Sequence, residues 1–135
     1  MTANMLKAIY DRAVGDKSDG SVYDRVGGRI YCPAAPEKVR LPYVVFINMT
    51  TPRSELYGAT HHEMQGRFVV YTLDTRDGTA AASIIDAVKA RFAAGAVLTV
   101  TDGTTVALRP GAVIGPEKIA GYMQAAMDFE FVVEE

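Results

Sequence analysis

Apolar residues recur at helical spacing in two stretches of the chain. In the first stretch they fall on one side of a helix, at Met5, Leu6, Ile9, Tyr10, Ala13 and Val14. Gly15 follows and is a natural helix end. From about Thr79 to Ala93 the stripe is formed by Ala81, Ile84, Ile85, Val88 and Phe92. The pattern predicts two helices, together with one short helical turn near Val22 that Gly27-Gly28 ends.

Other apolar stretches have the pattern of strands. β-Branched and aromatic residues run without interruption from Tyr43 to Ile47, which predicts a strand buried on both faces. The segment from His62 to Leu73 is rich in strand formers and is expected to be the longest strand. A short edge strand is expected over Arg29–Tyr31. Between Met127 and Glu134 apolar and acidic residues alternate, so the core-facing set is predicted to be Met127, Phe129, Phe131 and Val133.

The segment Val97–Leu108 has the pattern of a hairpin. Asp102-Gly103 suits a two-residue turn, whose central positions need positive φ. Such a turn would pair Thr99 with Val106. Both faces of the hairpin would then be partly apolar, with one on the core and the other in need of cover. The candidate subunit-interface residues are therefore Leu98, Val100, Val106 and Leu108.

Two further segments are expected to be irregular. No clear period exists from Pro110 to Gly121, which has room for one helical turn from Pro116. The segment from Thr50 to His62 is rich in Thr, Ser and Gly, and long loops of this kind are usually functional or disordered. The segment is a candidate docking loop that carries Arg53 and Glu55 and has Leu56 and Tyr57 near its tip. A plain flexible loop is the alternative.

The order of these elements is helix, strand, strand, helix, hairpin, strand. It predicts an α+β fold, with a mostly antiparallel sheet of about four to five strands and two helices packed on one face. A length of 135 residues fits one domain, residues 1–135. Hydrophobic residues make up 49% of the chain and charged residues 22%, enough for a real core. The start lacks a signal-peptide pattern and no apolar run is long enough for a bilayer, so we expect a soluble protein folded in the cytoplasm.

The charge and the cysteine count exclude several function classes. A net charge of −2 argues against a general nucleic-acid binder, which usually has a basic excess. One cysteine, Cys32, excludes an internal disulfide. No nearby residue pattern supplies Cys32 with a base or a lowered pKa, so a catalytic thiol is not expected.

The remaining chemistry-bearing residues do not form a recognisable site. His61-His62-Glu63 is the only cluster of metal-ligand types, but adjacent side chains in a strand point to opposite faces. Phosphate-binding glycine motifs and a nucleophile elbow are absent. Asp24, Glu37 and Glu63 could meet in space, although nothing in the sequence selects them. We therefore predict no catalytic, metal or cofactor-binding residues and no enzyme activity.

Several segments in order resemble one protein family. They are Val26-Gly27-Gly28-Arg29-Ile30-Tyr31, Leu41-Pro42-Tyr43-Val44-Val45-Phe46, the strand from Arg67 to Asp74 with the helix Ala80 to Phe92, and Ala125-Ala126-Met127-Asp128-Phe129-Glu130-Phe131. With the first helix they span nearly the whole chain. In this arrangement the chain resembles the tail-completion or tail-terminator proteins of long-tailed bacteriophages.

The resemblance implies a virion structural protein without a cofactor. Such proteins form a ring, commonly a hexamer, at the head-proximal end of the tail tube, where they stop tube growth and join the tail to the head. The implied partners are other copies, the major tail tube protein and a head-closure or connector protein, and DNA passes through the lumen without sequence-specific binding. The implied location is the virion neck, after assembly in the host cytoplasm. Another neck component, such as a head-closure protein, is the alternative; a small ligand-binding protein or enzyme is less favoured, because it needs a pocket with convergent polar groups.

Overall fold

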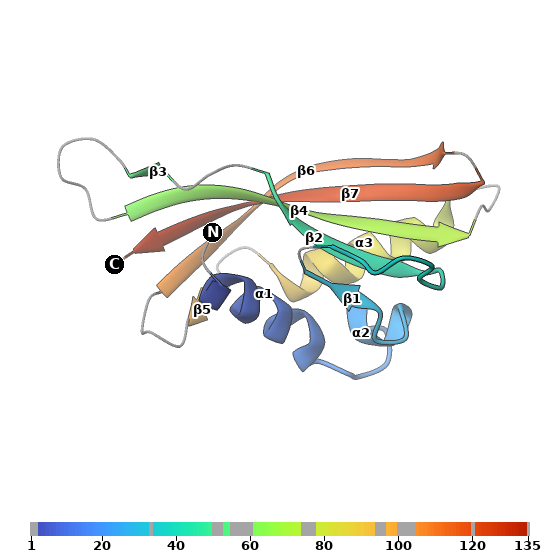
Figure 1. Cartoon of the computed structure of the whole chain (residues 1–135), viewed down its shortest axis with the longest axis horizontal. Helices are drawn as coiled ribbons and strands as arrows, with labels where there is room; N and C mark the ends of the chain where they lie inside the picture. Colours follow the sequence, from blue (N-terminus) through green and yellow to red (C-terminus); the bar gives the residue numbers. More distant parts are fainter. Residues whose placement is uncertain are drawn as a thin grey trace.

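The computed structural model describes residues 3–32, 34–49, 53–54, 61–73, 78–93, 97–99, 105–119 and 121–134. Its helices are α1 (Ala3–Gly15), α2 (Val22–Arg25) and α3 (Thr79–Arg91). Its strands are β1 (Ile30–Tyr31), β2 (Tyr43–Asn48), β3 (Arg53–Ser54), β4 (His61–Leu73), β5 (Val97–Thr99), β6 (Thr105–Ile119) and β7 (Tyr122–Glu134). A long sheet has the helices on one face (Figure 1). The predicted α+β class is confirmed.

The sheet is mostly antiparallel, as predicted, but it has more strands. Its order is β1-β2-β4-β7-β6-β5, with β3 paired to the first part of β4. Only the β1–β2 pair is parallel among the described strands. The centre is the β4–β7 pair, which runs from His61 opposite Glu134 to Leu73 opposite Tyr122. Two of the short strands were predicted: β1 lies within the expected edge strand, and β5 is the first arm of the expected hairpin. The strand β3 was not predicted, and its two residues are too few to produce a sequence period.

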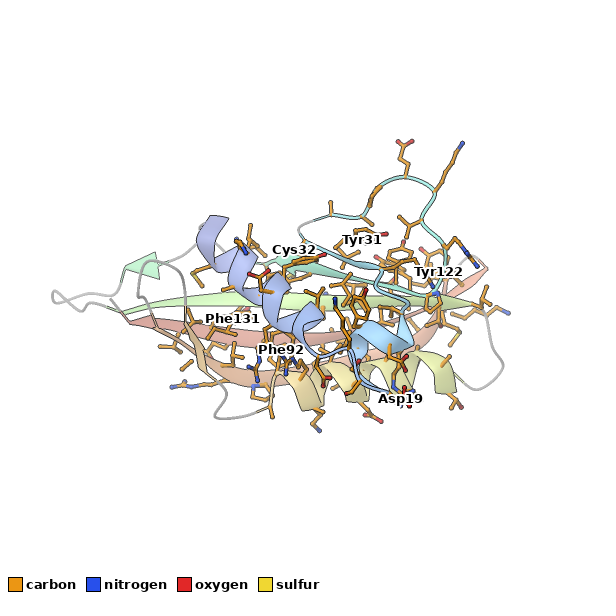
Figure 2. The ribbon with its side chains drawn as sticks, turned by 90° about the horizontal axis from the view of Figure 1, so that it is seen from below. Asp19, Tyr31, Cys32, Phe92, Tyr122 and Phe131 are labelled. Carbon is orange, nitrogen blue, oxygen red and sulfur yellow. The ribbon has the colours of Figure 1, made fainter. Side chains whose placement is uncertain are left out.

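The core lies between the helices and one face of the sheet, as the helix-side view in Figure 2 shows. Four phenylalanines of the sheet are buried there with Phe92, which follows α3: Phe46, Phe68, Phe129 and Phe131. The ring centroids of Phe68 and Phe92 are 4.8 Å apart, so the end of α3 is in direct contact with the sheet. The predicted stripe of α3 is buried, and so are Met127, Phe129 and Phe131 of the closing strand.

The ends of the two long helices hold each other through a reciprocal pair of hydrogen bonds. Arg12 Nε donates to the carbonyl oxygen of Arg91 at 2.9 Å, and Arg91 Nε donates to the carbonyl oxygen of Arg12 at 2.7 Å. These carbonyls belong to helix C-termini, which carry partial negative charge and favour a guanidinium. The Arg12 guanidinium also lies 5.8 Å from the centroid of the Phe92 ring. Burial lowers the pKa of Arg12, and the neighbouring Arg91 lowers it further.

The hairpin register differs from the prediction by one residue. Leu98 pairs with Val106 and Thr99 with Thr105, whereas a two-residue turn would pair Thr99 with Val106. The observed register places Leu98 and Val106 on the same face, and both are buried. A slip by one residue would move Leu98 to the opposite face of the sheet. The preference for burial therefore outweighs the preference of Asp102-Gly103 for a tight turn; the turn itself lies outside the described residues.

The segment predicted to be irregular is a strand. β6 has 15 residues and is longer than β4 with 13, so the prediction that His62–Leu73 is the longest strand is wrong. No helical turn begins at Pro116. The register of β6 against β7 shifts between Pro110 and Val113, and again between Ile114 and Glu117. These bulges break the two-residue period, and an edge strand tolerates proline because one of its sides makes no ladder bonds.

Candidate assembly surfaces

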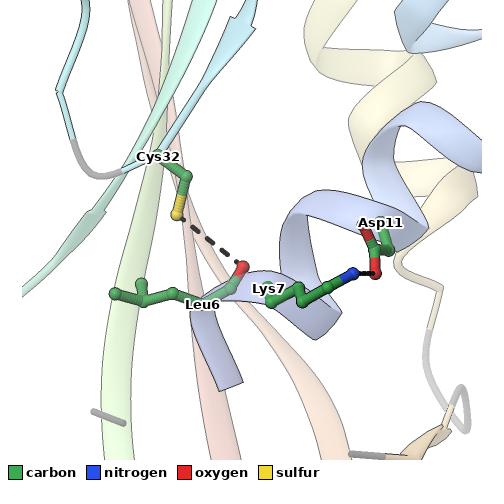
Figure 3. A network of polar contacts seen from close by, with 4 residues as sticks. All are labelled: Leu6, Lys7, Asp11 and Cys32. Atoms are coloured by element: carbon green, nitrogen blue, oxygen red, sulfur yellow. Dashed lines mark hydrogen bonds and ion pairs between the residues drawn. The ribbon is translucent and has the colours of Figure 1, made fainter. Parts of the chain in front are cut away.

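Cys32 lies just after β1 and faces α1, in the environment shown in Figure 3. Its Sγ is 4.0 Å from the carbonyl oxygen of Leu6. Burial raises the pKa of the Cys32 thiol to about 11. On the same helix Lys7 Nζ forms an ion pair with Asp11 at 2.6 Å, so this lysine is engaged with the carboxylate. At neutral pH Cys32 is a neutral thiol, which is a poor nucleophile and a poor metal ligand.

We expect Cys32 to react slowly with iodoacetamide in the folded protein. Its pKa is raised from 9.0 to about 11, so the thiolate fraction at pH 8 is about 100-fold lower than in the urea-unfolded chain. The rate should rise about tenfold per pH unit until the pH approaches 11, because only the thiolate reacts. Mass spectrometry of timed samples measures both quantities. A folded-state rate that levels off near pH 9 would contradict the raised pKa.

The other candidate polar residues do not converge. The described residues contain no group of three or more His, Cys, Asp or Glu that could hold a metal ion. His61 and His62 are successive positions of β4, and their side chains, like that of Glu63, lie outside the described set. Asp24 accepts a hydrogen bond from the backbone N–H of Gly20 at 3.0 Å, next to α2. Glu37 is exposed on the segment before β2, on a different element.

The predicted subunit-interface residues are largely in the chain's own core. Leu98, Val106 and Leu108 expose 5%, 0% and 3% of their surface, so these side chains are not free to contact another subunit in the folded chain. The prediction rested on the register of a two-residue turn, which would place Leu98 and Val106 on opposite faces of the hairpin. Val100 lies outside the described residues. Among the hairpin residues whose side chains are described, Ala107 is the one that is exposed.

The predicted docking loop falls mostly outside the described residues. The backbone of Arg53 belongs to β3 and is opposite Glu63 of β4. Glu55, Leu56 and Tyr57 lie outside the described set. A docking role for this loop therefore stays a prediction.

The sheet face opposite the helices carries a row of four tyrosines that the sequence reasoning missed. Tyr31, Tyr43, Tyr71 and Tyr122 come from the adjacent strands β1, β2, β4 and β7. Their successive ring centroids are 6.3, 4.8 and 5.6 Å apart, and all four side chains are half-buried. Val44 and Val70, the neighbours of Tyr43 and Tyr71, point into the core, so the tyrosines face the other way. Burial, with a smaller effect of the neighbouring tyrosines, raises the pKa of Tyr43 and Tyr71.

The same open face has a charged part farther along the strands. Arg67 of β4 is directly opposite Asp128 of β7. Arg67 Nε lies 2.6 Å from one carboxylate oxygen, and Nη2 lies 3.2 Å from the other. The hydrogen bond to Asp128 raises the pKa of Arg67. The open face thus combines an aromatic row with a bidentate ion pair, a composition typical of protein–protein contacts.

One hollow on the helix side is open to solvent. It has a volume of about 450 Å³ and lies between α2, α3 and the ends of β4 and β2, with Asp24, Arg25, Pro42, Thr72, Leu73 and Ile84 among its lining residues. Asp24 is held by the Gly20 N–H, and Thr72 Oγ1 donates to the carbonyl oxygen of Leu73 at 3.2 Å. Asp24 and Thr72 therefore make hydrogen bonds within the chain itself. Across the described helices, none combines the length and the apolar character needed to cross a membrane.

Comparisons with known proteins give structural matches only. No protein-family model matches the chain, and no curated protein matches it. A chain in a solved structure described as the virion of a native gene transfer agent particle superposes with a TM-score of 0.72 and 18% identity, covering 97% of this chain and 95% of that one. A second solved protein, identified only by a sequence number, gives a TM-score of 0.68 at 11% identity, with coverage of 100% and 97%. The protein therefore shares its fold, over almost its whole length, with a chain of a gene transfer agent virion.

Proposed function

We propose that the protein is a non-enzymatic structural component of a phage-like virion, and that it works as a tail terminator. In this role a ring of copies, most simply a hexamer, occupies the head-proximal end of the tail tube and stops its growth. The observation that carries the proposal is the fold likeness to a virion chain, which extends over 97% of this chain and 95% of the other. The ordered sequence segments that resemble tail-terminator proteins point independently to the same role.

A closed ring requires head-to-tail contacts between two different surfaces of each copy. We propose that the open sheet face supplies one of them, in place of Leu98, Val106 and Leu108, which are buried. Tyrosine-rich surfaces with a desolvated centre are typical of protein interfaces. Val69, on this face, is only 5% exposed although none of the described helices covers it. A partner could bury this surface with little further rearrangement.

The proposed partners follow from the same position in the particle. One side of the ring would contact the major tail tube protein, and the other a head-closure or connector protein. Arg53, Glu55, Leu56 and Tyr57 remain the candidate docking loop for one of these two contacts. A net charge of −2 is consistent with DNA passing through the lumen without sequence-specific binding.

Electron microscopy of tails assembled with the protein tests this function. We expect a ring of six copies at the head-proximal end of the tube. Tyr71→Asp should prevent the ring, because a charge in the centre of the tyrosine row cannot be buried cheaply. Tyr10→Asp is the matched control, since Tyr10 is 38% exposed on α1, and it should leave the ring intact. Density for the protein on the connector side alone would favour a head-closure protein, and absence of the protein from particles would refute a virion role.

A further inference from the structure

No described strand pairs with the outer edge of β6 between Leu108 and Glu117. Within the described part of the chain, β5 pairs with β6 only from Thr105 to Ala107. Every residue from 109 to 118 is exposed, although a strand with one covered face normally alternates between buried and exposed positions. The exposed residues include Val113 at 51% and Ile114 at 38%. Such an edge offers free backbone donors and acceptors to another strand.

The sequence of this edge is nearly symmetric about Val113. It reads Arg109-Pro110-Gly111-Ala112-Val113-Ile114-Gly115-Pro116-Glu117. In an antiparallel pair of two copies centred on Val113, proline would lie opposite proline, glycine opposite glycine, and Ala112 opposite the larger Ile114. Because proline has no N–H, pairing is limited to the window between Pro110 and Pro116. The two prolines therefore disfavour other registers.

The charged residues just outside the two prolines are complementary in the same register. Arg109 would lie opposite Glu117 of the second copy, and the symmetry produces this pair twice. Both side chains are on the open face of the sheet, because Arg109 pairs with Glu130 and Glu117 with Gln124 of β7, which alternate with buried neighbours. Opposite charges directly across an antiparallel pair are stabilising. Only a second copy of this chain is certain to carry this matching pattern.

A small groove lies beside the centre of the window on the helix side. It has a volume of about 120 Å³ and is bordered by α3 and β6, with Ala82, Ile85, Asp86, Lys89, Val113 and Pro116 among its lining residues. Val113 is opposite Met127 of β7, a core-facing residue, so its side chain is on this side of the sheet. In the centred register the second copy would place its own Val113 beside the groove. The contact would thus cover apolar surface as well as satisfy backbone groups.

We propose that two copies of the free protein pair through their β6 edges, antiparallel and centred on Val113. This contact is twofold and closes on two copies, whereas the proposed ring is head-to-tail. It is therefore a separate interaction surface of the free chain, which covers an otherwise open sheet edge before assembly. It does not depend on the tail-terminator role.

Reversing the charges at positions 109 and 117 tests the register. The dissociation constant of the dimer is measured by light scattering over a dilution series. Glu117→Arg places like charges opposite each other at two symmetric sites and should raise this constant about tenfold. Arg109→Glu should do the same, and the double variant should return to within about threefold of the original protein. A protein that is monomeric at every concentration, or a double variant weaker than either single one, would overturn the proposal.

Cysteine cross-linking tests the centre of symmetry. In a Cys32→Ser background, Val113→Cys should form a covalent dimer on mild oxidation, since only the central residue faces its own copy. Glu117→Cys is the matched control on the same edge: the two copies of residue 117 would be about 27 Å apart along the strand, too far for a disulfide. Equal cross-linking of the two variants would overturn the proposal. If rings form on tails but free Val113→Cys protein does not cross-link, this contact alone is overturned. If the free protein cross-links but no rings form on tails, the terminator role alone is overturned.

Discussion

Replacing Phe131 with alanine is expected to lower the free energy of unfolding by about 3–5 kcal/mol. The side chain is 0% exposed, and its ring meets that of Phe46 edge to face with centroids 5.6 Å apart. The centroid of Phe129 lies 6.4 Å away in the same cluster. Truncation removes buried apolar surface and leaves a cavity that these rings cannot fill, because the β2–β4 ladder holds the strand of Phe46 and the β4–β7 ladder holds that of Phe129.

Chemical denaturation followed by circular dichroism measures the Phe131→Ala effect, and Leu73→Ala is the control. Leu73 is 65% exposed at the end of β4, so its truncation should change the free energy of unfolding by less than about 0.5 kcal/mol. A loss below about 1 kcal/mol for Phe131→Ala would show that the closing strand faces the other way. The unfolding slope should be unchanged in both variants, because neither alters the amount of surface exposed in the unfolded chain appreciably.

The elements that could be predicted from the sequence are those whose signal is local. The stripe of α3 and the alternation of Met127, Phe129 and Phe131 depend only on neighbours within a few residues, and both predictions are confirmed. The strand at residues 43–47 was also located correctly, but it is not buried equally on both faces. Its residues on the open face include the half-exposed Tyr43 and Ile47.

The missed features depend on contacts between distant parts of the chain. The strand β6 was read as irregular because Pro110, Pro116 and two bulges erase the two-residue period. The turn signal at Asp102-Gly103 is local, yet the register follows the burial of Leu98 against the core, which no local pattern reports.

The surface proposed here for subunit contact was not found from the sequence, for the same reason. The tyrosine row joins residues from four strands, and their adjacency follows from the strand order β1-β2-β4-β7. In the sequence these tyrosines are 12 to 51 residues apart, at positions 31, 43, 71 and 122. The sequence shows that Tyr43 and Tyr71 are each next to a valine. It does not show that β7 is the neighbour of β4 in the sheet. The predicted interface at Leu98, Val106 and Leu108 was instead drawn from one hairpin considered alone.

The second large effect is expected at Gly66, a strand position where glycine leaves room for two aromatic rings. Gly66 lies in β4 opposite Phe129 of β7 and Asn48 of β2. A Cβ added at this position would overlap the ring of Phe46 and would come within 2.8 Å of the Phe131 ring. Both rings are buried, so neither can move away without disturbing the core.

We therefore expect Gly66→Ala to lower the free energy of unfolding by about 1–3 kcal/mol, as overpacking usually does. This sign is opposite to the intrinsic preference, since alanine in the interior of a regular element is usually favoured over glycine by about 0.5–1 kcal/mol. The overlapping atoms of Phe46 are Cζ and Cε2, which leucine lacks. In a Phe46→Leu background the added methyl group should therefore cost much less, and the two substitutions should couple favourably by about 0.5–3 kcal/mol in a double-mutant cycle. Denaturation of the four proteins measures this coupling. A Gly66→Ala variant as stable as the original protein, or a coupling near zero, would show that the Phe46 ring does not lie over Gly66.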